Sequence, residues 1–258
     1  MGTAQTLPRV DVLGVHVSAI SRQQAVAEIG RWVREREPHY VCVTGVHGVM
    51  ESQRDPALRR IHNESGLTTP DGMPLVWCSK AAGVGSVTRV YGPDLMLDVL
   101  EAGLGEGWRH YLYGGAEGVP ELLAEQLAAR LPGLQIAGTY SPPFRALTDE
   151  ESAEVVERIN GSGADLVWVG LSTPKQERWM AAHRARLQAP ALLGVGAAFD
   201  FHAGRVRQAP ALLQRVGLEW AFRLAVEPRR LWRRYFRNNP AFVARIVRRR
   251  PRLVQPSG

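Results

Sequence analysis

One carboxylate in the sequence lies in a turn that suits acid–base chemistry. Asp71 is framed by proline and glycine in the segment Thr69-Pro70-Asp71-Gly72-Met73-Pro74, directly after a short apolar run. A rigid, exposed turn of this kind can hold a carboxylate within reach of a substrate hydroxyl, as a general base requires. The same composition is typical of an ordinary Pro-Asp-Gly turn. Asp71 is therefore a candidate general base, although spacing alone favours the plain turn.

A glycine-containing turn could bind a diphosphate. The segment Tyr113-Gly114-Gly115-Ala116-Glu117-Gly118 follows a predicted strand and opens a predicted helix. Backbone N–H groups and the helix dipole at such a position attract phosphate oxygens. Gly114 and Gly115 are candidate nucleotide contacts on this ground, although a glycine turn between strand and helix is also common for steric reasons alone. The spacing differs from the dinucleotide fingerprint GxGxxG.

A second strand-to-helix turn carries polar side chains. The segment Gly170-Leu171-Ser172-Thr173-Pro174-Lys175-Gln176-Glu177 places Gln176 near the start of a predicted helix. In open α/β sheets, ligands bind outside the carboxyl ends of the strands. A capped helix start explains the serine and the threonine of this segment, but it explains neither Lys175 nor Gln176. A binding role and a purely structural role for Gln176 therefore both stay open.

The basic charge is concentrated at the C-terminal end. Residues 203–258 contain 14 Arg, no Lys and 2 acidic residues, whereas residues 1–202 contain 18 basic and 23 acidic residues. Such a tail predicts a polyanionic partner, either phospholipid head groups or nucleic acid, while the acidic body argues against a nucleic-acid groove. Aromatic residues alternate with arginines at positions 220–237, which suits the head-group region of a bilayer. Arginine also pairs well with diphosphate oxygens.

Several function classes lack their sequence signatures. The 7 histidines show no HExxH or similar ligand spacing, so no metal site is predicted, and no cofactor is predicted either. Gly-x-Ser-x-Gly is absent, which weighs against a serine hydrolase. The 2 cysteines, Cys42 and Cys78, lie in apolar stretches and predict reduced core thiols. There is no signal-like segment and no window of about 18 uncharged apolar residues, so we expect a cytoplasmic protein that does not span a membrane.

The elements that must position these residues alternate between strand and helix. Short β-branched or apolar runs occur at residues 10–15, 40–44, 110–113, 135–139, 166–171 and 192–197. Segments with helical spacing separate them: residues 22–36, a stretch through residue 60, and residues 119–131, 149–159 and 175–187. This alternation predicts an α/β fold, with a Rossmann-like, mostly parallel sheet and helices on both faces.

The tail departs from this alternation, because no strand pattern follows residue 208. Pro228 and Pro240 each suit the first turn of a helix, with Asn239 as a cap before the second. We therefore predict two or three short helices that form a small C-terminal appendage. The predicted domains are an α/β core at residues 1–205 and an Arg- and aromatic-rich membrane-docking appendage at residues 206–258.

Five motifs, in this order, resemble the TagA/WecG/CpsF family of glycosyltransferases, which act in bacterial teichoic acid, enterobacterial common antigen and exopolysaccharide synthesis. The resemblance covers roughly residues 10 to 240. Its most specific parts are Pro70-Asp71-Gly72, Arg89 with Gly92-Pro93-Asp94-Leu95, Pro174-Lys175-Gln176-Glu177, Gly194-Val195-Gly196-Ala197-Ala198-Phe199-Asp200-Phe201, and the segment from Gly217-Leu218-Glu219-Trp220 through Arg223 to Arg230.

The resemblance implies an inverting, metal-independent transfer from a UDP-sugar, often UDP-N-acetylmannosamine or a relative, to a polyprenyl-diphosphate-linked sugar. It implies two catalytic residues, with Asp71 as the general base and Thr44 as an active-site threonine. Residues expected to contact substrate or nucleotide are Arg89, Gln176 and, within the fourth motif, Asp200. Arginines expected to close over the site, engage diphosphate and dock on the membrane are Arg223, Arg230 and Arg233.

One departure from the family pattern lies beside the expected active-site threonine. The family often carries Thr-x-Asn, whereas this chain has Thr44-Gly45-Val46-His47. The missing asparagine leaves the donor and acceptor sugars open, with His47 as a candidate substitute.

The expected partners follow from the same resemblance and from the charge of the tail. They are a UDP-sugar donor, a polyprenyl-diphosphate-linked acceptor, and the anionic inner face of the plasma membrane, on which the protein would be peripheral. We further expect self-association of the chain and no nucleic-acid partner. The alternatives are a nucleotide-binding oxidoreductase, a nucleic-acid-binding protein that uses the basic tail, and a non-catalytic membrane adaptor.

Overall fold

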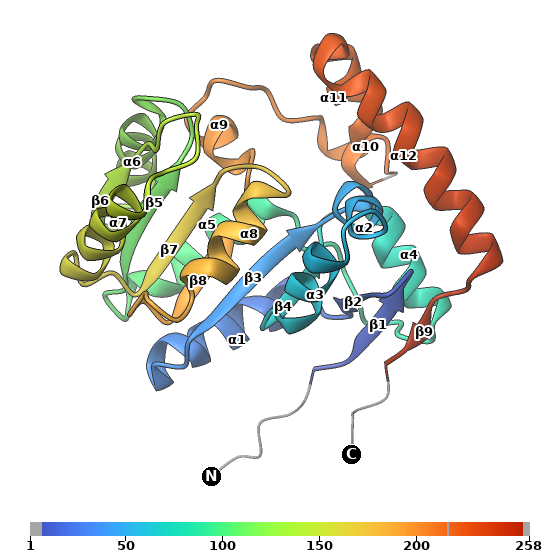
Figure 1. The fold of residues 1–258 in the computed structure, drawn as a ribbon, viewed down its shortest axis with the longest axis horizontal. Coiled ribbons are helices and arrows are strands. Elements are labelled where there is room, and N and C mark those ends of the chain that lie inside the picture. The colour runs from blue at the N-terminus through green and yellow to red at the C-terminus, as the bar shows by residue number, and fades with distance from the viewer. Residues whose placement is uncertain (1–6, 216, 255–258) are drawn as a thin grey trace. The chain divides into compact units, whose positions relative to one another are not determined.

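A computed structural model describes residues 7–215 and 217–254, which form two compact units. The first unit combines the described parts of Met1–Arg22, Thr44–Tyr91 and Gln208–Gly258. The second unit combines Gln23–Val43 and Gly92–Arg207. The chain thus passes between the units more than once (Figure 1). The predicted division into residues 1–205 and 206–258 stays a prediction.

Parallel strands form the centre of the second unit. They are β3 (His39–Thr44), β8 (Ala191–Gly194), β7 (Leu166–Gly170), β5 (Arg109–Gly114) and β6 (Gln135–Tyr140), in that order across the sheet. Each neighbouring pair is parallel. The residues of β8 and the first four of β7 are buried, which is why these strands are apolar throughout instead of alternating. Each predicted strand of this unit is confirmed.

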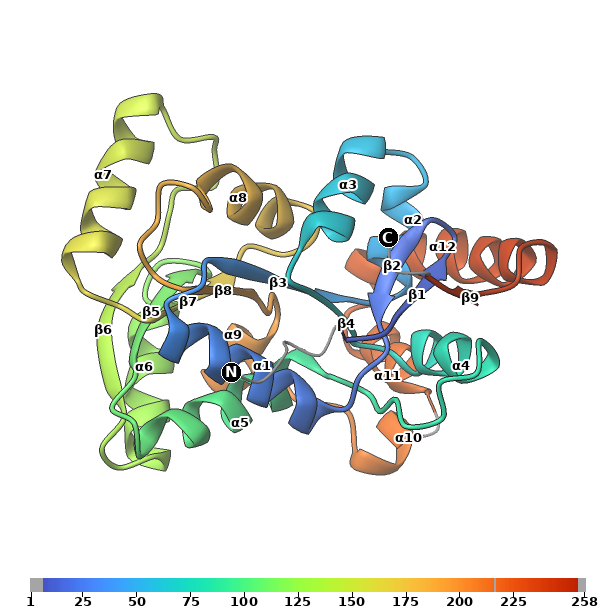
Figure 2. The ribbon, with the colours of Figure 1, turned by 90° about the horizontal axis from the view of Figure 1, so that it is seen from below.

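Helices cover both faces of this sheet, as Figure 2 shows. One face carries α1 (Arg22–Glu35), α5 (Gly92–Leu104), α6 (Val119–Arg130) and α9 (Ala198–His202), and the other carries α7 (Asp149–Gly161) and α8 (Lys175–His183). Thr148 is the N-cap of α7 and forms a capping box, in which its hydroxyl accepts from the Glu151 N–H. The predicted α/β, Rossmann-like fold is confirmed.

A small antiparallel sheet belongs to the first unit. The run at residues 10–15 was predicted as one strand, but it is a hairpin of β1 (Arg9–Val12) and β2 (Val15–Ser18). Its two-residue loop, Leu13-Gly14, has positive φ at both positions, as the hairpin turn that matches strand twist requires. A strand near the C-terminus, β9 (Arg252–Leu253), pairs with β1. The expectation that no strand follows residue 208 was therefore wrong, since a two-residue strand leaves no readable pattern.

The single helix predicted up to residue 60 is two helices, α2 (Val46–Ser52) and α3 (Pro56–Glu64). The break occurs because Asp55 caps α3, where its carboxylate accepts from the backbone N–H groups of Ala57 and Leu58. The chain then passes through β4 (Leu67–Pro70) to α4 (Met73–Ala81). The turn that carries Asp71 joins these last two elements.

The described part of the tail, residues 206–215 and 217–254, contains three helices: α10 (Ala211–Arg215), α11 (Glu219–Val226) and α12 (Pro228–Arg248). Pro228 begins α12 as predicted, but Pro240 lies inside α12, so the prediction that Pro240 opens a new helix was wrong. Leu231, Asn238 and Phe242 share one buried stripe at helical spacing, and packing of this stripe keeps both halves on one helix. Among the described helices, none is both long and apolar enough to cross a membrane.

The core of the first unit includes the tail. Phe242 of α12 is 5% exposed and belongs to the same buried cluster as Val10, Val17 and Leu75. The short strand β9 adds backbone hydrogen bonds to β1. Phe242 and β9 thus connect the tail to the core and to the small sheet of the first unit.

Candidate active site

Asp71 and Thr44, the two expected catalytic residues, lie next to each other. The Asp71 N–H donates to the Thr44 carbonyl at 3.0 Å, which ties the turn after β4 to the end of β3. A Cβ built on Gly45 would lie 3.7 Å from the Asp71 Oδ2, so the carboxylate lies over the backbone that follows Thr44. Thr44 is buried and Asp71 is partly exposed. The pair combines a fixed backbone with a carboxylate that solvent can reach.

Arg89 joins the Asp71 turn to the tail. Its Nε donates to the Asp71 carbonyl at 2.6 Å, and its two terminal nitrogens donate to Gln214 Oε1, at 3.1 Å, and to Glu219. Its guanidinium also stacks over the Tyr91 ring, 4.0 Å from the ring centroid. All three guanidinium nitrogens therefore have protein acceptors. The predicted contact between Arg89 and substrate stays a prediction.

Burial and nearby charges shift the pKa values of Glu219 and Tyr91, which lie beside Arg89. Burial raises the pKa of the Glu219 carboxyl, while the charge of Arg89 opposes this rise and that of Asp71 adds to it. Burial, together with the charges of Glu219 and Asp71, raises the pKa of the Tyr91 phenol above its usual range. These effects indicate that Glu219, Tyr91 and Asp71 share one electrostatic environment, which is the kind of cluster found at functional sites.

A second contact with the tail lies beside Thr44, where the family asparagine is missing. His47, in the first turn of α2, contacts Asn238 of α12, with 3.1 Å between the His47 Nδ1 and the Asn238 Nδ2. Arg54 donates to the Asn238 Oδ1 at 3.0 Å. Asn238 is 3% exposed, so both ends of its amide are used in a buried contact. Sequence reasoning missed Asn238, because 191 positions separate it from His47.

The glycine turn of the second unit is dictated by close packing. Gly114 and Gly115 have φ values of 122° and 77°, and a Cβ built on Gly114 would lie 2.7 Å from the backbone of Gly170. The Gly115 N–H donates to the Gly170 carbonyl at 3.0 Å. The steric reason for these glycines is thus present, and their predicted contact with a nucleotide stays a prediction.

Gln176 is the second residue of α8, and its side chain is turned inward. It is 3% exposed, and its Nε2 donates to the Gly194 carbonyl at 3.1 Å. Its Oε1 is buried and has no hydrogen-bond partner among the residues that the structure describes. A Cβ built on Gly196 would lie 3.3 Å from this oxygen. Gln176 therefore presents a buried acceptor beside a glycine, and water or a ligand could satisfy such an acceptor; its predicted contact with substrate stays a prediction.

The remaining predicted contacts lie on helices of both units. Asp200 is a partly exposed residue of α9, and its carbonyl accepts from the N–H groups of Arg205 and Val206. Arg223 is a partly buried residue of α11. Arg233 lies on α12 with its guanidinium 5.4 Å from the centroid of the Trp232 ring. Arg230 also lies on α12, but its side chain is outside the described ones.

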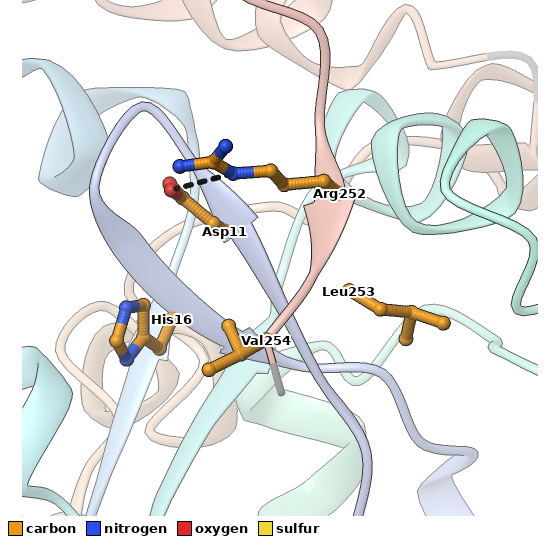
Figure 3. Close-up of a pocket in the computed structure, with 5 residues that line it drawn as sticks. All are labelled: Asp11, His16, Arg252, Leu253 and Val254. Atoms are coloured by element: carbon orange, nitrogen blue, oxygen red, sulfur yellow. Dashed lines mark ion pairs between the residues drawn. The ribbon is translucent and has the colours of Figure 1, made fainter. Parts of the chain in front are cut away.

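A surface pocket of about 370 Å³ lies elsewhere in the first unit, on the sheet of β1, β2 and β9 (Figure 3). It is lined by Asp11, His16, Arg252, Leu253 and Val254, and an ion pair of 3.8 Å joins Asp11 to Arg252. None of the predicted site residues lines it. Within residues 7–215 and 217–254, no group of three or more His, Cys, Asp or Glu side chains is arranged to hold a metal ion.

Comparison with known proteins identifies the family. Residues 10–255 match the model of the family described as "Glycosyl transferase WecG/TagA/CpsF family". A protein of Bacillus spizizenii is 30% identical over 206 residues, which cover 80% of this chain and 77% of that protein. A protein of Staphylococcus aureus is 24% identical over 247 residues, which cover 95% of this chain and 94% of that protein.

Both relatives carry the name N-acetylglucosaminyldiphosphoundecaprenol N-acetyl-beta-D-mannosaminyltransferase. The matched region includes every residue of the two clusters described above, from Thr44 to Asn238. The resemblance inferred from five motifs is thereby confirmed over nearly the whole length. This chain belongs to the WecG/TagA/CpsF family of glycosyltransferases.

Proposed function

We propose that this chain transfers an N-acetylmannosamine-like sugar from a UDP-sugar to a polyprenyl-diphosphate-linked sugar, with inversion and without a metal ion. The names of the two relatives support the acceptor class and the transferred sugar. The observation that carries the proposal is that the backbone of Asp71 is hydrogen-bonded at both of its polar groups. Its N–H donates to the Thr44 carbonyl, and its carbonyl accepts from the Arg89 Nε. A general base needs a carboxylate on a fixed backbone that a substrate hydroxyl can reach.

The reaction is a single displacement. The Asp71 carboxylate takes the proton from the acceptor hydroxyl as the hydroxyl oxygen forms a bond to the anomeric carbon of the donor. The bond from that carbon to the diphosphate oxygen breaks, and UDP leaves with the electron pair. Because attack occurs on the face opposite the leaving group, the configuration at the anomeric carbon inverts.

The departing UDP needs compensation for its charge, which fixed cations and helix N-termini can supply without a metal ion. For the first unit we assign this role to the arginines of the tail, Arg223, Arg230 and Arg233. For the second unit we assign nucleotide binding to the Gly114-Gly115 turn before α6, to Asp200 and to Gln176. The Gln176 Oε1 is a buried acceptor and would take a hydrogen bond from an N–H or O–H of the donor substrate.

The tail provides a surface for an anionic membrane. Four apolar side chains of α12 are between 48% and 74% exposed and recur at helical spacing: Trp232, Phe236, Val243 and Val247. The same helix carries arginines at positions 229, 233, 237, 245 and 248. This combination is typical of a helix that lies in the head-group region. We assign the protein to the inner face of the plasma membrane, where a lipid-linked acceptor would be met, and expect self-association there.

The test is UDP release from a panel of UDP-sugars, with and without a short-chain polyprenyl-diphosphate-linked amino sugar, in the presence of a chelator. Acceptor-dependent release from one donor would support a metal-independent transferase and name its sugar. Release that disappears with the chelator would contradict metal independence. No release from any donor, with vesicle binding retained, would favour a non-catalytic role for the basic tail.

A further inference from the structure

Within the first unit, Arg89 links the general-base turn to both short tail helices. Its Nε bonds the Asp71 carbonyl, while its terminal nitrogens bond Gln214 of α10 and Glu219 of α11. Gln214 is itself held, because its Nε2 donates to the Ala209 carbonyl at 2.8 Å. The orientation of the guanidinium is therefore set from the tail side as well as from the Tyr91 ring beneath it.

The Arg89–Glu219 ion pair is largely removed from water. The side chain of Arg89 is 15% exposed and that of Glu219 is 14% exposed. When an ion pair is buried to this extent, removing either partner leaves an uncompensated charge that is costly to keep away from water. Loss of the Glu219 charge would therefore weaken one of the contacts that set the orientation of the guanidinium.

We propose that Glu219 is a positioning residue for Asp71, acting through Arg89. Glu219, at the first position of α11, accepts a hydrogen bond from a terminal nitrogen of Arg89 and so helps to orient the guanidinium. In this orientation the Arg89 Nε donates to the Asp71 carbonyl and restrains it. The second backbone restraint on Asp71 is the bond from its N–H to Thr44. This inference rests on the proposed function, in which the Asp71 carboxylate is the general base. Small displacements of a catalytic group lower the rate more than they lower binding.

The experiment compares Glu219→Gln with Glu227→Gln in the full-length protein. Both substitutions remove one negative charge from the same tail, but only Glu219 contacts Arg89 among the described pairs. We expect kcat to fall about tenfold in Glu219→Gln, with the KM for the UDP-sugar unchanged, because a misplaced base loses rate on this order or more. Glu227→Gln should keep kcat within about twofold, because Glu227 is not among the described partners of Arg89.

A second readout does not depend on activity. Hydrogen exchange at the Asp71 amide reports whether its bond to the Thr44 carbonyl persists. We expect faster exchange at this amide in Glu219→Gln and unchanged exchange in Glu227→Gln. In a double-mutant cycle, Arg89→Lys combined with Glu219→Gln should be no slower than Arg89→Lys alone, because the proposed restraint on the Asp71 carbonyl passes through Arg89.

Glu219→Asp covers the case in which Glu219→Gln does not fold. It keeps the charge but shortens the side chain by one methylene, and we expect a kcat loss smaller than that of Glu219→Gln. Wild-type kcat together with wild-type Asp71 exchange, in either variant, would overturn the inference. A wild-type protein that turns over no donor would instead contradict the proposed function, while the exchange comparison would still decide whether Glu219 restrains Asp71.

Discussion

At the scale of single residues, the role best supported by geometry is that of Asp71 as the general base. Both its backbone N–H and its backbone carbonyl are hydrogen-bonded. The N–H donates to the Thr44 carbonyl and the Asp71 carbonyl accepts from Arg89, so two restraints on the turn do not involve the Asp71 carboxylate. Removing the charge of this side chain should therefore change the chemistry and leave the fold in place.

Asp71→Asn should lower turnover by about 10² or more, the scale expected when a general base is lost. The amide is close in size to the carboxylate, and both backbone bonds of residue 71 are kept, so the melting temperature should stay near that of the wild type. Steady-state UDP release and circular dichroism measure the two quantities. Near-normal turnover would remove Asp71 from its assigned role.

His110 should make stability depend on pH. It is fully buried, accepts from the Trp168 Nε1 at 3.2 Å, and burial lowers its pKa from 6.5 to about 3. Between these two values the unfolded chain binds a proton that the folded chain does not. The contribution of His110 is therefore fully present above pH 6.5 and is lost as the pH falls towards 3.

His110→Gln, which keeps an acceptor for Trp168, should remove this dependence. Between about pH 7.5 and about pH 5, the free energy of unfolding of the wild type should fall by roughly 2 kcal/mol more than that of the variant. Urea unfolding at the two pH values gives both numbers. Equal losses in the two proteins would show that His110 titrates normally in the folded state.

At the scale of elements, α12 combines a buried stripe and an exposed apolar stripe with different roles. Leu231, Asn238 and Phe242 face the first unit and are buried. Trp232 and Phe236 belong to the exposed stripe on the same helix. A helix that only packed against the protein would need the first stripe alone, and the second stripe is what a bilayer surface would bury.

Trp232→Ala combined with Phe236→Ala should weaken binding to anionic vesicles at least about tenfold, because burial of each aromatic side chain is worth on the order of 2 kcal/mol. The buried stripe is untouched, so folding should be unaffected. Phe144→Ala is a matched control, since Phe144 is 86% exposed and lies outside the tail. Vesicle co-sedimentation measures binding, and equal binding by the double variant would contradict a role for this stripe.

At the scale of the whole molecule, the charge asymmetry and the packing of the tail lead to one test. Residues 203–258 carry 14 Arg against 2 acidic residues, while the rest of the chain is slightly acidic. Yet Phe242 lies in the core of the first unit, and β9 pairs with β1. The tail should therefore contribute both membrane affinity and stability.

Truncation after Ala209 should abolish binding to anionic vesicles and should also destabilise the first unit. The lost side chains include the buried Leu231 and Phe242, and removal of one such core side chain typically costs about 2 to 5 kcal/mol. Vesicle co-sedimentation and thermal melting measure the two effects. Unchanged vesicle binding would refute the membrane role of the tail, and an unchanged melting temperature would support the predicted independent domain at residues 206–258.

Local patterns in the sequence were enough for much of the fold. The strands of the second unit and the start of α12 at Pro228 follow from periodicity, burial and capping, which act over a few residues. The same holds for the turn that presents Asp71, because proline and glycine set its backbone. Errors arose where local rules were too weak, as at Pro240, which packing keeps inside one helix.

The sequence by itself determined the α/β alternation, the Asp71 turn, the glycine turn at Gly114-Gly115 and the family of the chain. Only the tertiary structure decided which tail residues meet the Asp71 turn and α2. Arg89 and Glu219 are 130 positions apart, and His47 and Asn238 are 191 apart. No local pattern links such residues, because their contact depends on how the tail packs into the first unit and on the burial that makes breaking the Arg89–Glu219 pair costly.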